Sequence, residues 1–189
     1  MDDQNHNNEM VPGTSRNKAC GLLALALLCG FFSAEVVARP QVYAVNDTIE
    51  AVFGSPPEYV GTTVAGDSRF AAYQGDDPNS LISYLLLYQE EATYVGTADL
   101  ESHIRAFVEE QAGTTGGSTI HFSFGRIGDE VGAYFTIQYQ YRNEVAVRNA
   151  VTIYRAGKLY QWGMDYYPGR NKASPKLFSR YAESFKVDP

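Results

Sequence analysis

The fold is decided by residues 158–187, which read KLYQWGMDYYPGRNKASPKLFSRYAESFKV. Large side chains occupy every second position of the first part: Tyr160, Trp162, Met164 and Tyr166. That alternation predicts a strand with one aromatic face. Pro168-Gly169 predicts a turn. Ser174 followed by Pro175 predicts a closing helix, because serine caps a helix and proline fits its first position.

Three segments upstream show the same period of two: residues 119–126, 130–142 and 145–155. Short turns are expected at Asn143-Glu144 and at Ala156-Gly157. Turns of two residues join antiparallel neighbours. We therefore predict an antiparallel meander that ends in residues 158–166.

The first half of the domain is also expected to be β-structure. One strand is predicted with a single apolar face, made of Val45, Ile49, Ala51 and Phe53. Residues 58–65 and 68–74 are predicted to form a hairpin around Gly66-Asp67. Residues 81–89 are apolar on both faces, which is typical of a strand covered on both sides.

One amphipathic helix is expected over residues 97–113. Thr97 is placed to cap it and Gly113 to end it. Its apolar stripe consists of Leu100, Ile104, Phe107 and Val108. Together with the closing helix, these elements predict an α+β fold, in which two main helices flank a twisted antiparallel sheet with a meander.

Residues 1–38 are expected to be an export leader, followed by a single domain over residues 39–189. Basic residues precede an apolar run over residues 19–34. Small or short side chains at Val36 and Ala38 suit signal peptidase, which predicts cleavage after Ala38.

Two alternatives stay open for the leader. Left uncleaved, residues 19–38 have about the minimum length for a membrane anchor. Met10 is an alternative start to Met1, because it would give a basic segment without acids ahead of the apolar run. Lipidation at Cys29 is disfavoured, since Leu28 stands where a lipoprotein signal usually has a small residue.

The composition excludes some classes of function. The formal charge is −7, and residues 39–189 keep 13 basic and 18 acidic residues, a charge of −5. Nucleic acid is not expected as a partner, because phosphate binding needs clustered Lys and Arg. Cys20 and Cys29 both lie in the leader, so no disulfide or cysteine metal ligand is expected after cleavage.

Several short motifs follow one another in a familiar order: Phe53-Gly54-Ser55-Pro56-Pro57, Tyr84 and Tyr88, Gly157-Lys158-Leu159-Tyr160-Gln161, Pro168-Gly169, and Ala182-Glu183-Ser184-Phe185-Lys186. This order resembles exported bacterial proteins and lipoproteins with a PsbP-like fold. That fold is shared with the photosystem II extrinsic subunit P and with a Ran-binding nuclear import factor. The resemblance covers most of residues 42–187, although the proline that usually follows the first phenylalanine comes later here.

The resemblance implies a PsbP-like sandwich for residues 39–189. It also implies a role in binding or assisting other proteins, which is what most members with a known role do. No catalytic residue is shared across the fold, so none is transferred to this chain.

One candidate partner surface is predicted near the C-terminus: Trp162, Tyr166, Tyr167 and Arg170. Tyrosine and arginine beside a loop are favoured in protein interfaces. The alternative is that these aromatic side chains only build the core.

No catalytic, cofactor or metal residue is predicted. His103 and His121 show no convergence with carboxylates of the kind that a metal site needs. Asp76-Asp77 is expected to cap a turn with its side chains rather than to bind calcium.

These observations predict a non-catalytic accessory or protein-binding module of the cell envelope, periplasmic or extracellular, whose partner is another envelope protein. The alternatives are a small-ligand-binding protein, or a hydrolase whose residues meet only in three dimensions. A further alternative is a domain anchored in the inner membrane that faces the periplasm. Membrane contact is expected only through residues 19–38, if they stay uncleaved.

Overall fold

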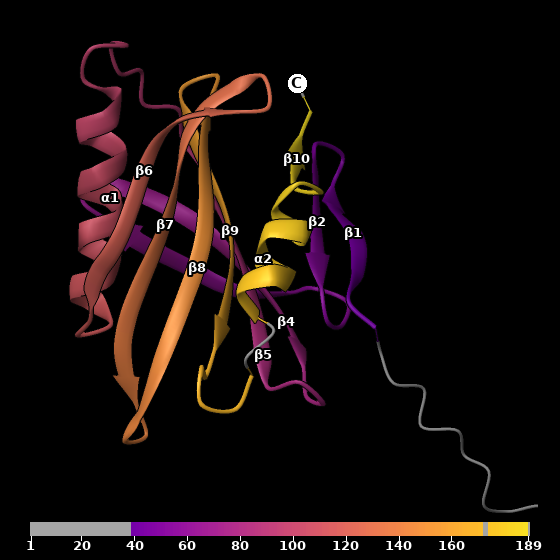
Figure 1. Ribbon diagram of the computed structural model, residues 1–189. Coiled ribbons are helices and arrows are strands. Elements are labelled where there is room, and N and C mark those ends of the chain that lie inside the picture. Colours follow the sequence, from indigo (N-terminus) through magenta and orange to yellow (C-terminus); the bar gives the residue numbers. More distant parts are fainter. Residues whose placement is uncertain (1–38, 172–173, 189) are drawn as a thin grey trace, which may run out of the picture. The chain divides into compact units, whose positions relative to one another are not determined.

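The computed structural model describes residues 39–171 and 174–188 (Figure 1). Their elements in chain order are β1 (Gln41–Asn46), β2 (Ile49–Phe53), β3 (Glu58–Ala65), β4 (Ser68–Asp77), β5 (Ile82–Gln89), α1 (Leu100–Thr114), β6 (Ser118–Ile127), β7 (Glu130–Tyr141), β8 (Glu144–Arg155), β9 (Lys158–Tyr166), α2 (Ser174–Ala182) and β10 (Lys186–Val187). The α+β class is confirmed.

Seven strands form one antiparallel sheet in the order β3-β4-β5-β9-β8-β7-β6. Strands β6, β7 and β8 each pair with the next strand of the chain, which confirms the predicted meander. The β7–β8 turn is formed by Arg142 and Asn143, with φ of 50° and 64°. Positive φ at both positions suits a tight two-residue hairpin. This turn lies one residue earlier than predicted, because Glu144 already belongs to β8.

The single first strand predicted through Val45 and Phe53 is wrong. The chain turns there instead, so that β1 and β2 form an antiparallel hairpin. The Oδ1 of Asn46 accepts hydrogen bonds from Thr48 N at 2.9 Å and Thr48 Oγ1 at 3.0 Å, which stabilises the turn locally. Strand β10 pairs with β2, giving a second sheet in the order β1-β2-β10.

Each face of the large sheet carries a separate hydrophobic core over part of its area. Helix α1 lies on one face, and α2 with the small sheet lies on the other (Figure 1). The predicted α1 stripe is buried in the first core, together with Phe70 and Phe135. In the second core, the ring of Trp162 stacks on Phe178 at 5.7 Å between centroids, and its Nε1 donates to the carbonyl of Val52 at 2.8 Å.

The start of α1 differs from the prediction. The helix begins at Leu100 with Asp99 as its N-cap, and no side chain makes a capping hydrogen bond there. Thr97 lies in the preceding turn, so it is not the cap. The start of α2 at Ser174, with Pro175 next, is as predicted.

The predictions for the leader fall on residues 1–38, which lie outside the described residues. Within residues 39–171 and 174–188, neither helix combines the length and the apolar character needed to cross a bilayer.

Candidate functional site

Two of the four predicted surface residues are buried, which corrects that part of the prediction. Trp162 is 0% exposed and Tyr166 is 5% exposed. Both lie on β9, the middle strand of the large sheet, and point into the core beneath α2. The hydroxyl of Tyr166 accepts a hydrogen bond from Asn149 Nδ2 at 3.0 Å. These two side chains therefore build the core rather than a partner surface.

The other two predicted residues reach solvent. Tyr167 is half-buried and Arg170 is exposed. The guanidinium of Arg170 forms an ion pair with Glu144, with Nε donating to Oε2 at 2.9 Å, and lies 5.6 Å from the Tyr167 ring centroid. Partner contact by these two residues stays a prediction.

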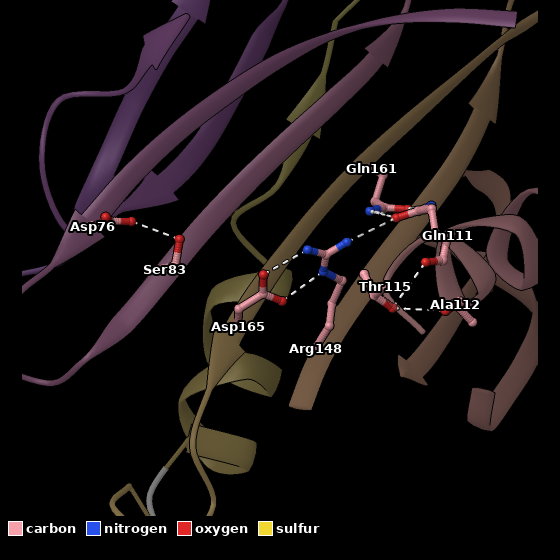
Figure 2. A network of polar contacts seen from close by, with 8 residues as sticks. All are labelled: Asp76, Ser83, Gln111, Ala112, Thr115, Arg148, Gln161 and Asp165. Atoms are coloured by element: carbon pink, nitrogen blue, oxygen red, sulfur yellow. Dashed lines mark hydrogen bonds and ion pairs between the residues drawn. The ribbon is translucent and has the colours of Figure 1, made fainter. Parts of the chain in front are cut away.

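Strand register brings polar side chains into one row across the α1 face of the sheet. Asp76 on β4 is opposite Ser83 on β5, Ser83 is opposite Asp165 on β9, and Asp165 is opposite Arg148 on β8. Directly opposed residues of antiparallel strands share a face. Residues that are distant in the sequence thus lie side by side on neighbouring strands (Figure 2).

The centre of this row is the ion pair of Arg148 and Asp165. Arg148 Nε donates to Oδ1 and Nη2 donates to Oδ2, each at 2.7 Å, in a bidentate arrangement. The two side chains are 13% and 20% exposed. Burial alone would lower the pKa of Arg148, but the facing Asp165 carboxylate holds that pKa above its usual value.

A buried glutamine pair joins this row to the end of α1 (Figure 2). Gln111 Nε2 donates to Gln161 Oε1 at 2.7 Å, and Gln161 Nε2 donates back to Gln111 Oε1 at 3.0 Å. Arg148 Nη1 also donates to Gln111 Oε1, at 3.3 Å. These bonds hold the last turn of the helix against the middle of the sheet.

An open groove of about 450 Å³ lies at the end of this row and is lined mainly, though not only, by residues of the α1 face. Its lining residues are Gln74, Asp76, Asp77, Pro78, Leu81, Ile82, Ser83, Tyr139, Tyr141, Ala146, Asp165, Tyr166 and Tyr167, and none belongs to α1. We call this the α1-side groove. Burial raises the pKa of the Tyr139 hydroxyl, and the charge of Asp165 adds to the shift, so this tyrosine stays neutral over the physiological range.

The two aspartates at the end of β4 have different roles. Asp77 is buried and caps the following turn, as predicted: its carboxylate accepts from Asn79 N at 3.0 Å and from Ser80 Oγ at 2.5 Å. Asp76 is exposed in the groove, where Oδ1 accepts from Ser83 Oγ at 2.8 Å and from Gln74 Nε2 at 3.0 Å.

A second open groove, the α2-side groove, has a volume of about 490 Å³. It is lined by His121, Ser123, Tyr134, Phe135, Thr136, Asn149, Pro175, Phe178, Ser179 and Glu183. Its floor is hydrogen-bonded, since Thr136 Oγ1 donates to Asn149 Oδ1 at 2.9 Å.

The predicted histidines do not converge on a shared site. His121 is exposed on β6, whereas His103 is half-buried on α1. Across the described residues, no group of three or more His, Cys, Asp or Glu side chains is arranged to hold a metal ion.

Sequence reasoning missed Arg148, Gln111 and Gln161 as members of a site. A signal was present in β8, where small residues, Ala146 and Ala150, flank Arg148 on the face opposite Val145, Val147 and Val151. Small residues there indicate that this face is covered as well. A charged residue on a covered face needs a partner of opposite charge.

Comparisons with known proteins give the fold. No protein-family model matches the chain, and no curated protein matches it by sequence. The solution structure of cyanobacterial PsbP (CyanoP) from Synechocystis sp. PCC 6803 matches with a TM-score of 0.58 and 16% identity, over 80% of this chain and 94% of that one. A crystal structure of a Pseudomonas aeruginosa protein of unknown function has a TM-score of 0.49 and 10% identity, over 80% and 99% of the two chains. The chain therefore has a PsbP-like fold, as the sequence motifs predicted.

Proposed function

We propose that this protein is a non-catalytic accessory module of the cell envelope that binds another envelope protein through the α1-side groove. The observation that supports this most is the uncovered row of polar and tyrosine side chains beside a rigid ion pair. Rigid elements, rather than loops, carry most of this groove, which favours binding in one defined geometry.

The tyrosines are the expected source of binding energy. Tyr139, Tyr141 and Tyr167 come from β7 and from the segment after β9, and they line one groove. Tyrosine offers a large apolar ring and a polar tip, and loses little conformational freedom on binding. Tyr141 is 47% exposed, so a partner would remove considerable apolar area from water.

Export is the second part of the proposal. Cleavage after Ala38 would release a domain that begins at Arg39, into the periplasm or the medium. Retention of residues 19–38 would leave the domain anchored to the inner membrane. An intact mass of the protein recovered from its producing cells decides between the two, since the mass starts either at Arg39 or further upstream.

The non-catalytic assignment rests on how the groove's acids are held. The carboxylate of Asp165 is ion-paired with Arg148, and the carboxylate of Asp77 accepts a hydrogen bond from Ser80 in its own turn. Turnover by the purified protein that a single groove substitution abolishes would contradict the assignment.

Partner binding is tested by quantitative affinity purification of tagged variants from the native host. Tyr141→Ser should reduce the recovery of the specific partner several-fold, because it removes an exposed ring at the rim of the groove. Tyr94→Ser is the matched control: Tyr94 is 83% exposed, and it lies next to Gly157 in the β8–β9 turn, at the other end of the sheet. Equal recovery from both variants would contradict the proposal.

The α2-side groove supports a second candidate function, the binding of a small ligand. An aromatic wall of Tyr134 and Phe178 stands over a floor in which Asn149 and Thr136 are hydrogen-bonded. Apolar walls with a few fixed polar groups are typical of ligand sites. A ligand that binds the wild type and is lost with Thr136→Val would favour this function; a screen with no such ligand would count against it.

A further inference from the structure

The α1-side groove has a one-sided charge. Its lining includes three aspartates, Asp76, Asp77 and Asp165, and no lysine or arginine. Asp165 is neutralised from behind by Arg148, and Asp77 is buried in hydrogen bonds to its own turn. Asp76 is the remaining carboxylate that faces the groove.

Asp76 is held in place by neutral donors only. Its Oδ1 accepts from Ser83 Oγ and Gln74 Nε2, and its Oδ2 has one long contact to Gln74 Nε2 at 3.3 Å. Among the described residues, 39–171 and 174–188, no lysine or arginine lies within ion-pair distance of the Asp76 carboxylate. A carboxylate can accept about four hydrogen bonds, so Asp76 keeps acceptor capacity for a charged donor.

Tyrosine rings elsewhere in the groove also suit a cation. The protein's own arginines already lie over two of the groove tyrosines: Arg142 is 5.2 Å from the Tyr141 centroid, and Arg170 is 5.6 Å from the Tyr167 centroid. Both distances fall within about 6 Å, the range for attraction between a cation and a ring face. These two contacts show that the rim tyrosines attract guanidinium groups, and the chain's own arginines already lie over one face of each ring.

We infer that the α1-side groove receives an arginine or lysine side chain of the protein partner, with Asp76 as its counter-ion. This inference rests on the proposed function, because it names the chemistry of the partner at that site. Charge complementarity favours such an occupant, since an acidic segment would meet the aspartates and the −5 charge of residues 39–189. The bound side chain donates to Oδ2 of Asp76, within the groove that the tyrosines also line.

The test uses two probes of the same shape and different charge. Nα-acetyl-arginine methylamide carries the guanidinium, whereas the citrulline analogue replaces it with a neutral urea. Each is titrated into the protein as isolated from its host, and Kd is measured from the NMR shifts of isotope-labelled tyrosine rings. We expect the arginine probe to bind about fivefold more tightly than the citrulline probe. One partly exposed ion pair with a ring contact accounts for a difference in affinity of this size.

Two variants locate the preference. Asp76→Asn should remove the difference between the probes, while Asp67→Asn should preserve it. Asp67 is also exposed and lies in the β3–β4 turn, at the opposite end of β4 from Asp76. Equal affinity for arginine and citrulline probes, or a preference that survives Asp76→Asn, would overturn the inference.

The captured partner separates this inference from the proposed function. A partner that depends on Tyr141 but is recovered equally well by Asp76→Asn would overturn the inference and leave the proposed function standing. Failure to capture any Tyr141-dependent partner would contradict the proposed function, whatever the probes show. Loss of the partner with both Tyr141→Ser and Asp76→Asn, but not with Asp67→Asn, supports both.

Discussion

Replacing Asp165 with asparagine should be among the most damaging single changes of charge in this domain. It would leave the guanidinium of Arg148, only 13% exposed, without a counter-charge, with the asparagine amide oxygen and Gln111 at 3.3 Å as neutral acceptors. Breaking a fully buried pair costs about 3–5 kcal/mol, and partial access of water should reduce this to about 2–3 kcal/mol here. Arg148→Met should cost a similar amount, because Asp165 is then the uncompensated charge.

The double variant Arg148→Met with Asp165→Asn gives the sharper test. With both charges removed, no uncompensated ion is left, so the double variant should be less destabilised than the sum of the single variants. We expect a coupling of about 2 kcal/mol. Urea unfolding followed by the fluorescence of Trp162 measures it, since this single tryptophan is fully buried in the folded protein.

A surface pair provides the control for this cycle. Arg105 and Glu101 on α1 form an ion pair at 2.9 Å, with side chains that are 48% and 50% exposed. Exposed pairs at this spacing couple by only about 0.3–0.5 kcal/mol. If the coupling of Arg148 with Asp165 is no larger than that of the control pair, the argument that burial makes this pair important is refuted.

Two further predictions concern stability. Gly132→Ala on β7 should destabilise the fold by about 2 kcal/mol or more in urea unfolding, because the added Cβ would approach the carbonyl oxygen of Thr152 to 2.1 Å. Gly125→Ala on the neighbouring strand meets nothing within 4 Å and should cost far less; similar losses would contradict the packing argument. Burial lowers the pKa of His103 below its ordinary 6.5, so the unfolded chain binds that proton more readily. Stability should therefore fall as the pH drops from about 6.5 towards the lowered value, and His103→Gln should flatten this fall in a pH series of unfolding curves; an unchanged slope would exclude His103 as its source.

The meander and the closing helix could be predicted from local patterns because their signals are strong. Alternation in residues 130–142 and 158–166 is long and uninterrupted, and the turns between strands have short, polar or glycine-containing sequences. Ser174-Pro175 combines two independent start signals for a helix. Each of these elements depends mainly on residues close in the sequence.

The first hairpin could not be predicted in the same way. Its turn, Asp47-Thr48, contains neither glycine nor proline, and apolar residues continue with similar spacing on both sides. What separates β1 from β2 is the Asn46 side chain, together with the pairing of β2 with β10 at the far end of the chain. The second of these is a long-range contact that periodicity does not report.

The candidate site was only partly accessible to sequence reasoning for a related reason. Alternation showed that Trp162 and Tyr166 share a face, but not that α2 and the small sheet cover that face. The opposite face, which carries Asp165, is the one that stays open in the α1-side groove. Arg148 and Asp165 meet only because strand register aligns β8 with β9, and register depends on the whole sheet.

The central claim is that the α1-side groove is where a partner binds, and in-cell photo-crosslinking tests it most directly. A photoreactive phenylalanine derivative at position 141, in the native host, should give a discrete adduct with one envelope protein. Mass spectrometry should map that adduct to a segment containing arginine or lysine. The same group at position 94, on the exposed tyrosine beside the β8–β9 turn, should give no such adduct. A partner that crosslinks from position 94 and not from position 141 would contradict the claim.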